Sequence, residues 1–98
     1  MGELRVEWDP RKAAANLRKH GVSFTEAETV FSDEYGLLID DPEHSMDEDR
    51  FILLGVSATS RLLVVVHWYR VDDLVIRIIS ARKADRSERR HYEERGSG

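Results

Sequence analysis

Apolar side chains are concentrated between residues 50 and 80, where leucine, isoleucine and valine form three dense segments separated by polar turns. Such segments predict β-strands, because β-branched residues pack well on a pleated surface and polar residues end the runs. The run Leu62–Val66 does not alternate between apolar and polar positions, which indicates a central strand covered on both faces. The predicted strands are Leu4–Trp8, Tyr35–Asp40, Arg50–Val56, Leu62–Tyr69 and Leu74–Ser80.

A first helix is predicted between Asp9 and Gly21. Asp9 followed by Pro10 is typical of a helix start, and a glycine is typical of the position just beyond a helix end. The helical period places four residues on one face, which we expect to pack against the sheet. These residues are Ala13, Ala14, Leu17 and His20.

Two capping boxes predict two further helices. Ser23 with Glu26 begins a short helix, and Asp85 with Glu88 begins a last helix that ends near Glu94. The short helix has an apolar stripe, whereas the last helix is polar on almost every side. The stripe consists of Phe24, Ala27, Val30 and Phe31.

The order of these elements predicts an α+β fold. We expect a mainly antiparallel sheet of four to five strands, with two N-terminal helices and one C-terminal helix, because consecutive strands with short connections usually pair antiparallel. Ninety-eight residues are enough for one domain. Residues 1–98 are therefore expected to form a single domain, with residues 96–98 as a tail.

The composition argues against several classes of site. The chain has no cysteine, so it has no disulfide framework and no thiolate metal site. Its four histidines are 23 or 24 residues apart, unlike compact metal-ligand motifs, and we expect neither a metal nor another cofactor. No apolar run approaches the roughly 20 residues of a membrane span, and the N-terminus does not resemble a signal peptide. A cytoplasmic protein is expected.

Charge is distributed unevenly along the chain. The net charge is −4, which alone disfavours nucleic-acid binding. However, residues 20–49 hold ten acidic residues and no lysine or arginine, while residues 77–98 hold seven basic and four acidic residues. The segregation fits a cationic face for an anionic partner, or an ordinary solvated surface. The same alternatives apply to the arginines of the last helix, which could contact RNA or a protein partner, or only aid solubility.

Arg70 and Arg77 lie within apolar strands. A guanidinium stays charged when it is desolvated, so each must be paired, reach solvent or bind an anion. With Arg82 and Lys83 nearby, these arginines suit a phosphodiester. In the alternative interpretation, Arg77 forms a structural ion pair with Glu7, Glu48 or another carboxylate. Strict alternation would place Arg77 on one face with Val75, Ile79 and Ala81.

His44 is the histidine best suited to proton transfer. It lies in the acidic segment 41–49, four residues before Glu48, and a nearby carboxylate would raise its pKa and favour the imidazolium. It could then act as a general acid, or it could be a loop histidine bonded to its neighbours. The other three histidines are expected to cap a helix (His20), to lie in the interior (His67) and to lie on a solvated helix (His91).

Several separate motifs follow one another along the chain: Glu7-Trp-Asp-Pro10, Asn16–Phe24, His44-Ser45 with Glu48 and Arg50, and Arg77–Arg82. In this order they resemble the BrnT family of toxins from bacterial type II toxin–antitoxin systems. The resemblance extends from about Val6 to Tyr92. It implies a RelE-like fold, metal-independent ribonuclease activity and a BrnA-type antitoxin with a ribbon-helix-helix part. It further implies a complex of two toxins and two antitoxins, which contacts operator DNA only through the antitoxin.

The resemblance and the strand-borne cations predict an endoribonuclease in which the ribose 2′-hydroxyl attacks the adjacent phosphorus and translation and growth stop. This reaction needs a proton acceptor, a proton donor and cations near the phosphate. The expected catalytic residues are His44, Glu48, Arg70, Arg77 and Lys83, and the expected RNA contacts are Arg50, Arg82, Arg86 and Arg89.

One short segment departs from the family pattern. Members often carry Thr-Glu-Arg where this chain has Trp68-Tyr69-Arg70, so a catalytic carboxylate at position 69 is excluded. The departure favours an alternative, a non-catalytic module that binds the antitoxin and tunes repression of the operon. Whether the chain alone stops growth would separate the two.

Overall fold

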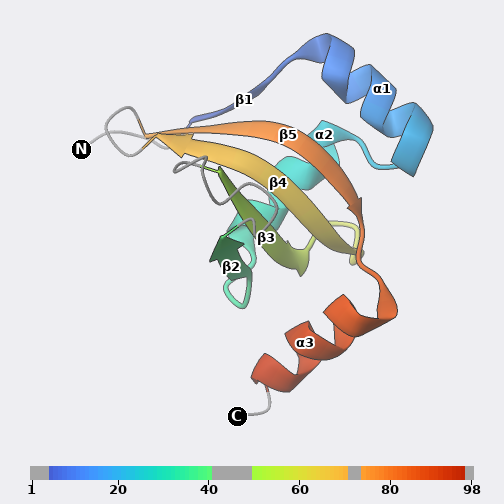
Figure 1. Cartoon of the computed structure of the whole chain (residues 1–98), viewed down its shortest axis with the longest axis vertical. Helices are drawn as coiled ribbons and strands as arrows, with labels where there is room; N and C mark the ends of the chain where they lie inside the picture. Colours follow the sequence, from blue (N-terminus) through green and yellow to red (C-terminus); the bar gives the residue numbers. More distant parts are fainter. Residues whose placement is uncertain (1–4, 41–49, 71–73, 97–98) are drawn as a thin grey trace.

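The computed structural model describes residues 5–40, 50–70 and 74–96, and its strands form one sheet in the order β1-β5-β4-β3-β2 (Figure 1). Strand β1 pairs with β5 in parallel, and the other neighbours pair antiparallel. The expected α+β fold is confirmed. The elements are β1 (Arg5–Trp8), α1 (Pro10–His20), α2 (Phe24–Thr29), the 3-10 turn η1 (Val30–Ser32), β2 (Leu37–Asp40), β3 (Arg50–Val56), β4 (Leu62–Arg70), β5 (Val75–Lys83) and α3 (Arg86–Gly96).

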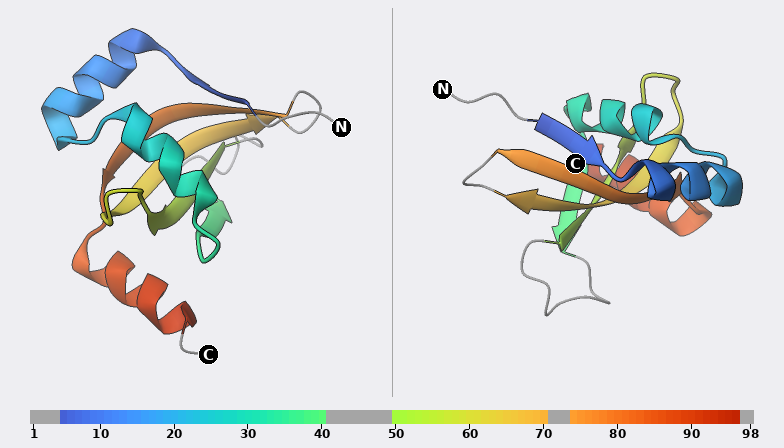
Figure 2. Two further views of the ribbon diagram at one scale, coloured as in Figure 1. Left: turned by 180° about the vertical axis from the view of Figure 1, so that it is seen from behind. Right: turned by 90° about the horizontal axis from the view of Figure 1, so that it is seen from above.

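Helix α2 crosses one face of the sheet, and α3 lies at the end of the opposite face (Figures 1 and 2). On β4, Leu63 and Val65 pack toward α2, while Leu62 and Val64 pack on the opposite side. The central, doubly covered strand expected from the run Leu62–Val66 is therefore confirmed. The main core consists of Val22, Phe24, Ala27, Val30, Leu53, Leu63, Val65, Ile78 and Ala81.

Helix α1 begins and ends as expected but turns a different side toward the sheet. The Asp9 side chain accepts a hydrogen bond from the Arg11 amide, and Gly21 adopts φ 70° just after the helix. Ala14 and Leu17 are exposed, although they were expected to pack. Asn16 is buried instead, so this part of the predicted apolar face is wrong.

The burial of Asn16 follows from the shortness of β1. Strand β1 pairs with β5 only as far as Ile78, so the backbone of Ala81 has no strand partner on that side. The Asn16 amide replaces the missing strand: Nδ2 donates to Ala81 O at 2.7 Å, and Oδ1 accepts from Ala81 N at 3.1 Å. Buried backbone groups without partners are costly, so this pairing sets the rotation of α1.

Strand β5 is longer and less regular than predicted. It extends to Lys83, so Arg82 and Lys83 lie within the strand rather than after Ser80. Ser80 pairs with Val66 and Ile78 pairs with His67, which leaves Ile79 as an extra residue in a β-bulge. The bulge places Ala81 in the core beside Ile78, so the expectation that Arg77 and Ala81 share a face is wrong.

Helix α3 is capped at its start and is bonded near its end to Asp33, the residue after η1. At its start, Asp85 and Glu88 form the expected capping box, with two bonds of 2.8 Å. Near its end, the Tyr92 hydroxyl donates to Asp33 Oδ2 at 2.6 Å, and burial together with this bond raises the pKa of Tyr92 to about 12. None of the described helices is long and apolar enough to cross a membrane.

Candidate nucleic-acid interface

The sheet face opposite α2, here called the open face, carries a row of polar and aromatic side chains across four strands. Arg50 on β3 pairs with Trp68 on β4, Trp68 pairs with Arg77 on β5, and Arg77 pairs with Glu7 on β1. Directly paired residues have Cβ atoms about 5 Å apart. The row therefore places an indole between two guanidinium groups.

Alternation along the strands explains why this row faces away from α2. Trp8 contacts Phe24 edge-on, and His67 contacts Phe31 edge-on, so these two residues face α2 and η1. Their neighbours Glu7 and Trp68 consequently point to the open face. Trp68 is 42% exposed, even though β4 is the central strand.

Arg77 forms an ion pair at the surface. Its Nη1 donates to Glu7 Oε2 at 2.7 Å, and the two side chains are 42% and 50% exposed. The structural ion pair considered from the sequence is thus present. It uses one of the five N–H donors of the guanidinium and lies where a phosphate could reach the others.

Arg82 also lies on the open face, because it pairs with Val64. Its Nη1 and Nη2 donate to the two carboxylate oxygens of Glu88 at 2.8 and 2.7 Å. This fork joins β5 to the start of α3 and neutralises much of the charge that the sequence offered to RNA. Lys83, Arg86 and Arg89 are exposed around the same junction.

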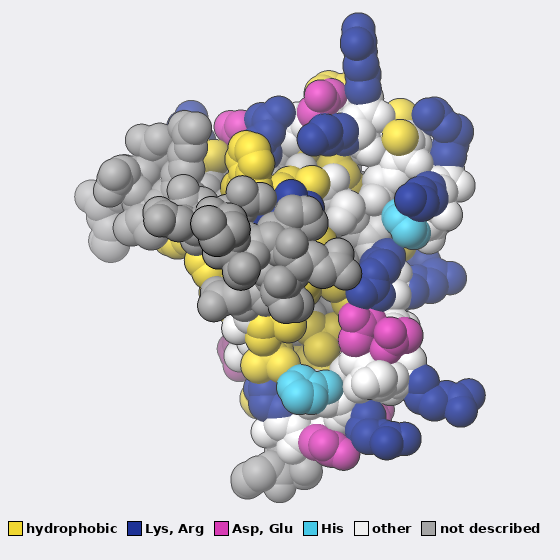
Figure 3. Space-filling model, viewed as in Figure 1, with side chains coloured by type: hydrophobic (Ala, Val, Ile, Leu, Met, Phe, Trp, Pro, Cys, Tyr) yellow, Lys and Arg dark blue, Asp and Glu magenta, His cyan; other side chains and the backbone are white. Residues whose placement is uncertain are grey.

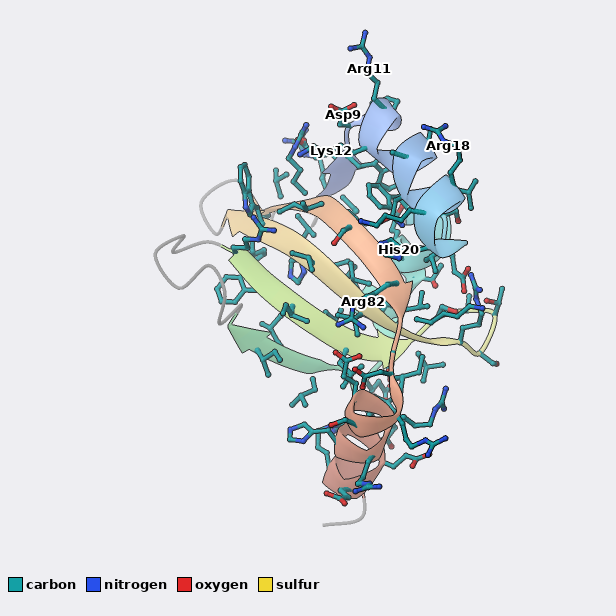
Figure 4. The ribbon with its side chains drawn as sticks, turned by 45° about the vertical axis from the view of Figure 1, so that its right-hand side comes forward. Asp9, Arg11, Lys12, Arg18, His20 and Arg82 are labelled. Carbon is teal, nitrogen blue, oxygen red and sulfur yellow. The ribbon has the colours of Figure 1, made fainter. Side chains whose placement is uncertain are left out.

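Basic side chains form a band along one edge of the molecule. In Figure 3, lysines and arginines line the right-hand edge from α1 down to α3. Figure 4 shows Arg82 on the front of β5, while Arg11, Lys12 and Arg18 project from α1 above it. This band borders the open face and gives a local positive field despite the net charge of −4.

A small hollow of about 120 Å³ lies between the open face and α3. Its floor is apolar, and Glu88 and His91 stand at its α3 side. His91 is exposed on α3 as expected, but its position at a hollow beside the sheet was not predicted. The apolar residues lining the hollow are Leu37, Ile39, Ile52, Leu54 and Val64.

Three expected catalytic residues are not located by the structure. His44 and Glu48 belong to residues 41–49, which lie outside the described part of the chain. Arg70 ends β4 and its backbone pairs with Val75, but its side chain is outside the described part too. Arg50 follows this segment directly, at the start of β3, and is half-buried.

His67 is an interior histidine, one of the roles considered for it. It is 2% exposed, its Nδ1 lies 3.2 Å from Val65 O, and burial lowers its pKa. His20 is half-buried at the end of α1, where we expected it. Within residues 5–40, 50–70 and 74–96, no group of three or more His, Asp or Glu side chains is arranged to hold a metal ion.

Sequence reasoning missed Trp68 as a surface residue. An isolated tryptophan in an apolar strand resembles a core residue, and from the sequence Trp68 stood out only because it departs from the family pattern. The available signal was alternation along the strand, which puts Trp68 and Arg70 on the face opposite His67. With His67 in the interior, Trp68 would then face solvent. The cross-strand pairing with Arg50 and Arg77 could not be read before the register was known.

Comparison with known protein families gives a match over residues 8–88, to the family described as ribonuclease toxin, BrnT, of type II toxin–antitoxin system. The match covers most of the chain, including α1, α2 and strands β2 to β5, but only the last residue of β1. The chain belongs to the BrnT family. Members of this family are ribonuclease toxins of type II toxin–antitoxin systems, which implies an antitoxin partner for BrnT proteins.

The fold is that of a solved BrnT protein. A crystal structure at 1.1 Å resolution of the Brucella abortus ribonuclease toxin BrnT superimposes with a TM-score of 0.65 and 22% sequence identity. The alignment covers 86% of this chain and 100% of that chain. No curated protein matches the sequence.

Proposed function

We propose that this BrnT protein is a metal-independent endoribonuclease whose RNA site is the open face. The observation that carries the proposal is the family match over residues 8–88. The row of Arg50, Trp68 and Arg77 supports the location, because it places an exposed and a half-buried cation on either side of an exposed indole on one sheet. The ribose 2′-hydroxyl would attack the adjacent phosphorus and give a 2′,3′-cyclic phosphate and a 5′-hydroxyl end.

Arg77 and Arg70 are proposed to stabilise the charge that develops on the phosphate oxygens. Lys83, also expected in this role, pairs with Leu63 on the α2 side of the sheet and would act away from the open face. Glu7 would hold the Arg77 side chain in position through its 2.7 Å bond. His44 and Glu48 are proposed to transfer the protons. The proposed RNA contacts are Arg50, Arg82, Arg86 and Arg89, of which Arg82 would have to share its guanidinium with Glu88.

The proposed partner is a BrnA-type ribbon-helix-helix antitoxin in a complex of two toxins and two antitoxins. Operator DNA would be bound only by the antitoxin. Residues 1–98 are proposed to act in the cytoplasm as a single RelE-like toxin domain with a tail at residues 96–98, and RNA cleavage there would stop translation and growth.

A non-catalytic module that binds the antitoxin and tunes repression is the second candidate. It is favoured by Tyr69, which replaces the glutamate that family members often carry. Such a module would keep the fold and the antitoxin surface but would not stop growth when expressed alone.

Single-turnover cleavage of an end-labelled RNA tests the proposal. We expect cleavage in the presence of EDTA, cyclic-phosphate product ends, and no cleavage of the same sequence made of DNA. Loss of cleavage in EDTA, or cleavage of the DNA strand, would contradict the 2′-hydroxyl mechanism. No cleavage under any condition, combined with normal growth, would favour the non-catalytic module.

A further inference from the structure

Trp68 is exposed on the open face and belongs to neither of the two clusters of buried core residues in the described part of the chain. Elsewhere on β4, the run Leu62–Val65 is buried on both faces, while Trp68 is 42% exposed on the open face. The other tryptophan, Trp8, is half-buried and packs against Phe24. An indole in water at the centre of a sheet presents a flat apolar surface that can bind another flat group.

The neighbours of Trp68 suggest what that group is. Cross-strand pairing puts Arg50 on one side and Arg77 on the other, each about 5 Å away at Cβ. A nucleotide has the matching layout, with a flat base and a phosphate on either side along the chain. Proteins recognise unpaired RNA by stacking bases on aromatic rings and by holding the phosphates with arginine.

The rigidity of the row adds to the fit. All three residues lie on strands in the middle of one sheet, and the backbones of Trp68 and Arg77 are paired on both sides, whereas Arg50 among the described residues pairs only with Trp68. Glu7 orients Arg77 from the adjacent strand β1. A site on such a framework loses little conformational entropy on binding.

We propose that Trp68 is a stacking platform for one unpaired base of the RNA substrate, with Arg50 and Arg77 engaging the phosphates on either side of that nucleotide. The inference rests on the proposed ribonuclease function and specifies its substrate as single-stranded RNA. A duplex would not bind in this way, because its bases are already stacked on each other and are not accessible to the indole.

Fluorescence can test this directly, because the chain has two tryptophans. In a Trp8→Phe background, whose fold is checked by circular dichroism, Trp68 is the single reporter. The probe is a 2′-O-methyl RNA of about ten nucleotides, which lacks the attacking hydroxyl and cannot be cleaved. We expect the single strand to quench Trp68 fluorescence and the same sequence in a duplex to leave it unchanged.

Affinity variants in the otherwise unchanged chain complete the test. Trp68→Ala should weaken binding of the single strand roughly 5- to 100-fold, and Trp68→Phe should weaken it less. Tyr35→Ala is the matched control: Tyr35 is 61% exposed and lies beside Arg95, outside the row, so its removal should not change the affinity.

The outcomes separate the platform from the nuclease activity. Quenching and loss of affinity in Trp68→Ala support the platform even if the wild-type protein cleaves no RNA, in which case only the proposed function fails. If the wild-type protein cleaves RNA and Trp68→Ala binds and cleaves RNA equally well, the platform is overturned and the proposed function stands. Unchanged RNA binding with weakened antitoxin binding also overturns it, and assigns Trp68 to a protein interface.

Discussion

Arg77 is both paired and exposed, two situations that the sequence could only pose as alternatives. It is paired with Glu7, and it is also 42% exposed on the open face. An ion pair between exposed side chains contributes little to stability, typically about 0–1 kcal/mol. The ion pair with Glu7 is therefore a weak reason for a charge at this position, and binding of an anion explains the charge of Arg77 better.

The first variant to make is Arg77→Ala. We expect RNA cleavage to fall by about 100-fold or more, because a cation at the developing phosphate charge is lost. Arg77→Lys should restore only part of the rate, since an ammonium cannot bind two oxygens in a fork. Single-turnover rates and urea unfolding curves measure the two effects separately.

Glu7→Gln provides the control for this variant, because it removes the ion pair but leaves the Arg77 charge. It should lower the cleavage rate less than Arg77→Ala. An Arg77→Ala protein that fails to fold, while Glu7→Gln also loses much of its stability, would show that the ion pair is structural.

At the scale of elements, the parts predictable from sequence are those decided by local chemistry. The caps at Asp9, Ser23 and Asp85 each accept the expected backbone hydrogen bond. The burial of β4 followed from its composition. The rotation of α1 did not, because it depends on the two hydrogen bonds between Asn16 and Ala81, 65 residues away. Tertiary pairing of this kind overrides the apolar pattern of a short helix.

The connection between β3 and β4 is held to α2 by a partly buried hydrogen-bond network that the sequence patterns did not predict. Glu26 accepts hydrogen bonds from Arg61, Ser57 and Thr59, and its side chain is 14% exposed. The Arg61 guanidinium, helped by the two hydroxyls, lowers the pKa of Glu26 from 4.5 to about 2. The carboxylate is thus much more stable in the folded protein than in the unfolded chain.

This shift predicts how stability depends on pH. A carboxyl whose pKa is lowered by folding stabilises the protein fully above its unfolded value, and the contribution disappears as pH falls from about 4.5 to about 2. At pH 7, Glu26→Gln should reduce the free energy of unfolding by about 2–3 kcal/mol. The difference from the wild type should shrink steadily below pH 4.5. Urea unfolding at a series of pH values measures it.

Glu28→Gln is the matched control, because Glu28 is an exposed glutamate on the same helix. It should change the free energy of unfolding by less than about 0.5 kcal/mol at every pH. A Glu26→Gln defect that does not vary between pH 7 and pH 3 would mean that packing, rather than the charge, supplies the stability.

At the scale of the whole molecule, the sequence separated acidic from basic segments, and the structure gathers the basic ones along one edge (Figure 3). The sequence could not say that Arg82 would be engaged by Glu88, because that depends on how α3 leaves β5. The sequence also could not predict that the basic residues of α1 and α3 lie along the same edge, because only the fold brings the two helices there.

The proposed antitoxin is expected to cover the junction of β5 and α3. Reversing three exposed charges there, Lys83→Glu, Arg86→Glu and Arg89→Glu together, should weaken the toxin–antitoxin complex at least 10-fold, because carboxylates of the partner would meet like charges. Arg82 is left unchanged, since its fork to Glu88 supports the fold. Calorimetric titration of the purified proteins measures the affinity.

The same number of charges can be reversed on α1 as a control, with Arg11→Glu, Lys12→Glu and Arg18→Glu. This variant has the same net charge but should bind the antitoxin with close to wild-type affinity. Equal weakening by both triple variants would point to the field of the whole molecule. Tight, fully inhibitory binding by the α3 variant would place the antitoxin on another surface.

The bulge at Ile79 makes the length of β5 part of the site. Arg77 and Arg82 are five positions apart, and in a regular strand an odd separation puts two side chains on opposite faces. The extra residue brings both to the open face. A regular strand of the same length would direct one of the two arginines into the apolar core under α2, whereas deletion of Ile79 would remove the bulge and leave both on one face, four positions apart. A related sequence with both arginines would therefore need either this bulge or an even spacing between them to keep the arrangement described for this chain.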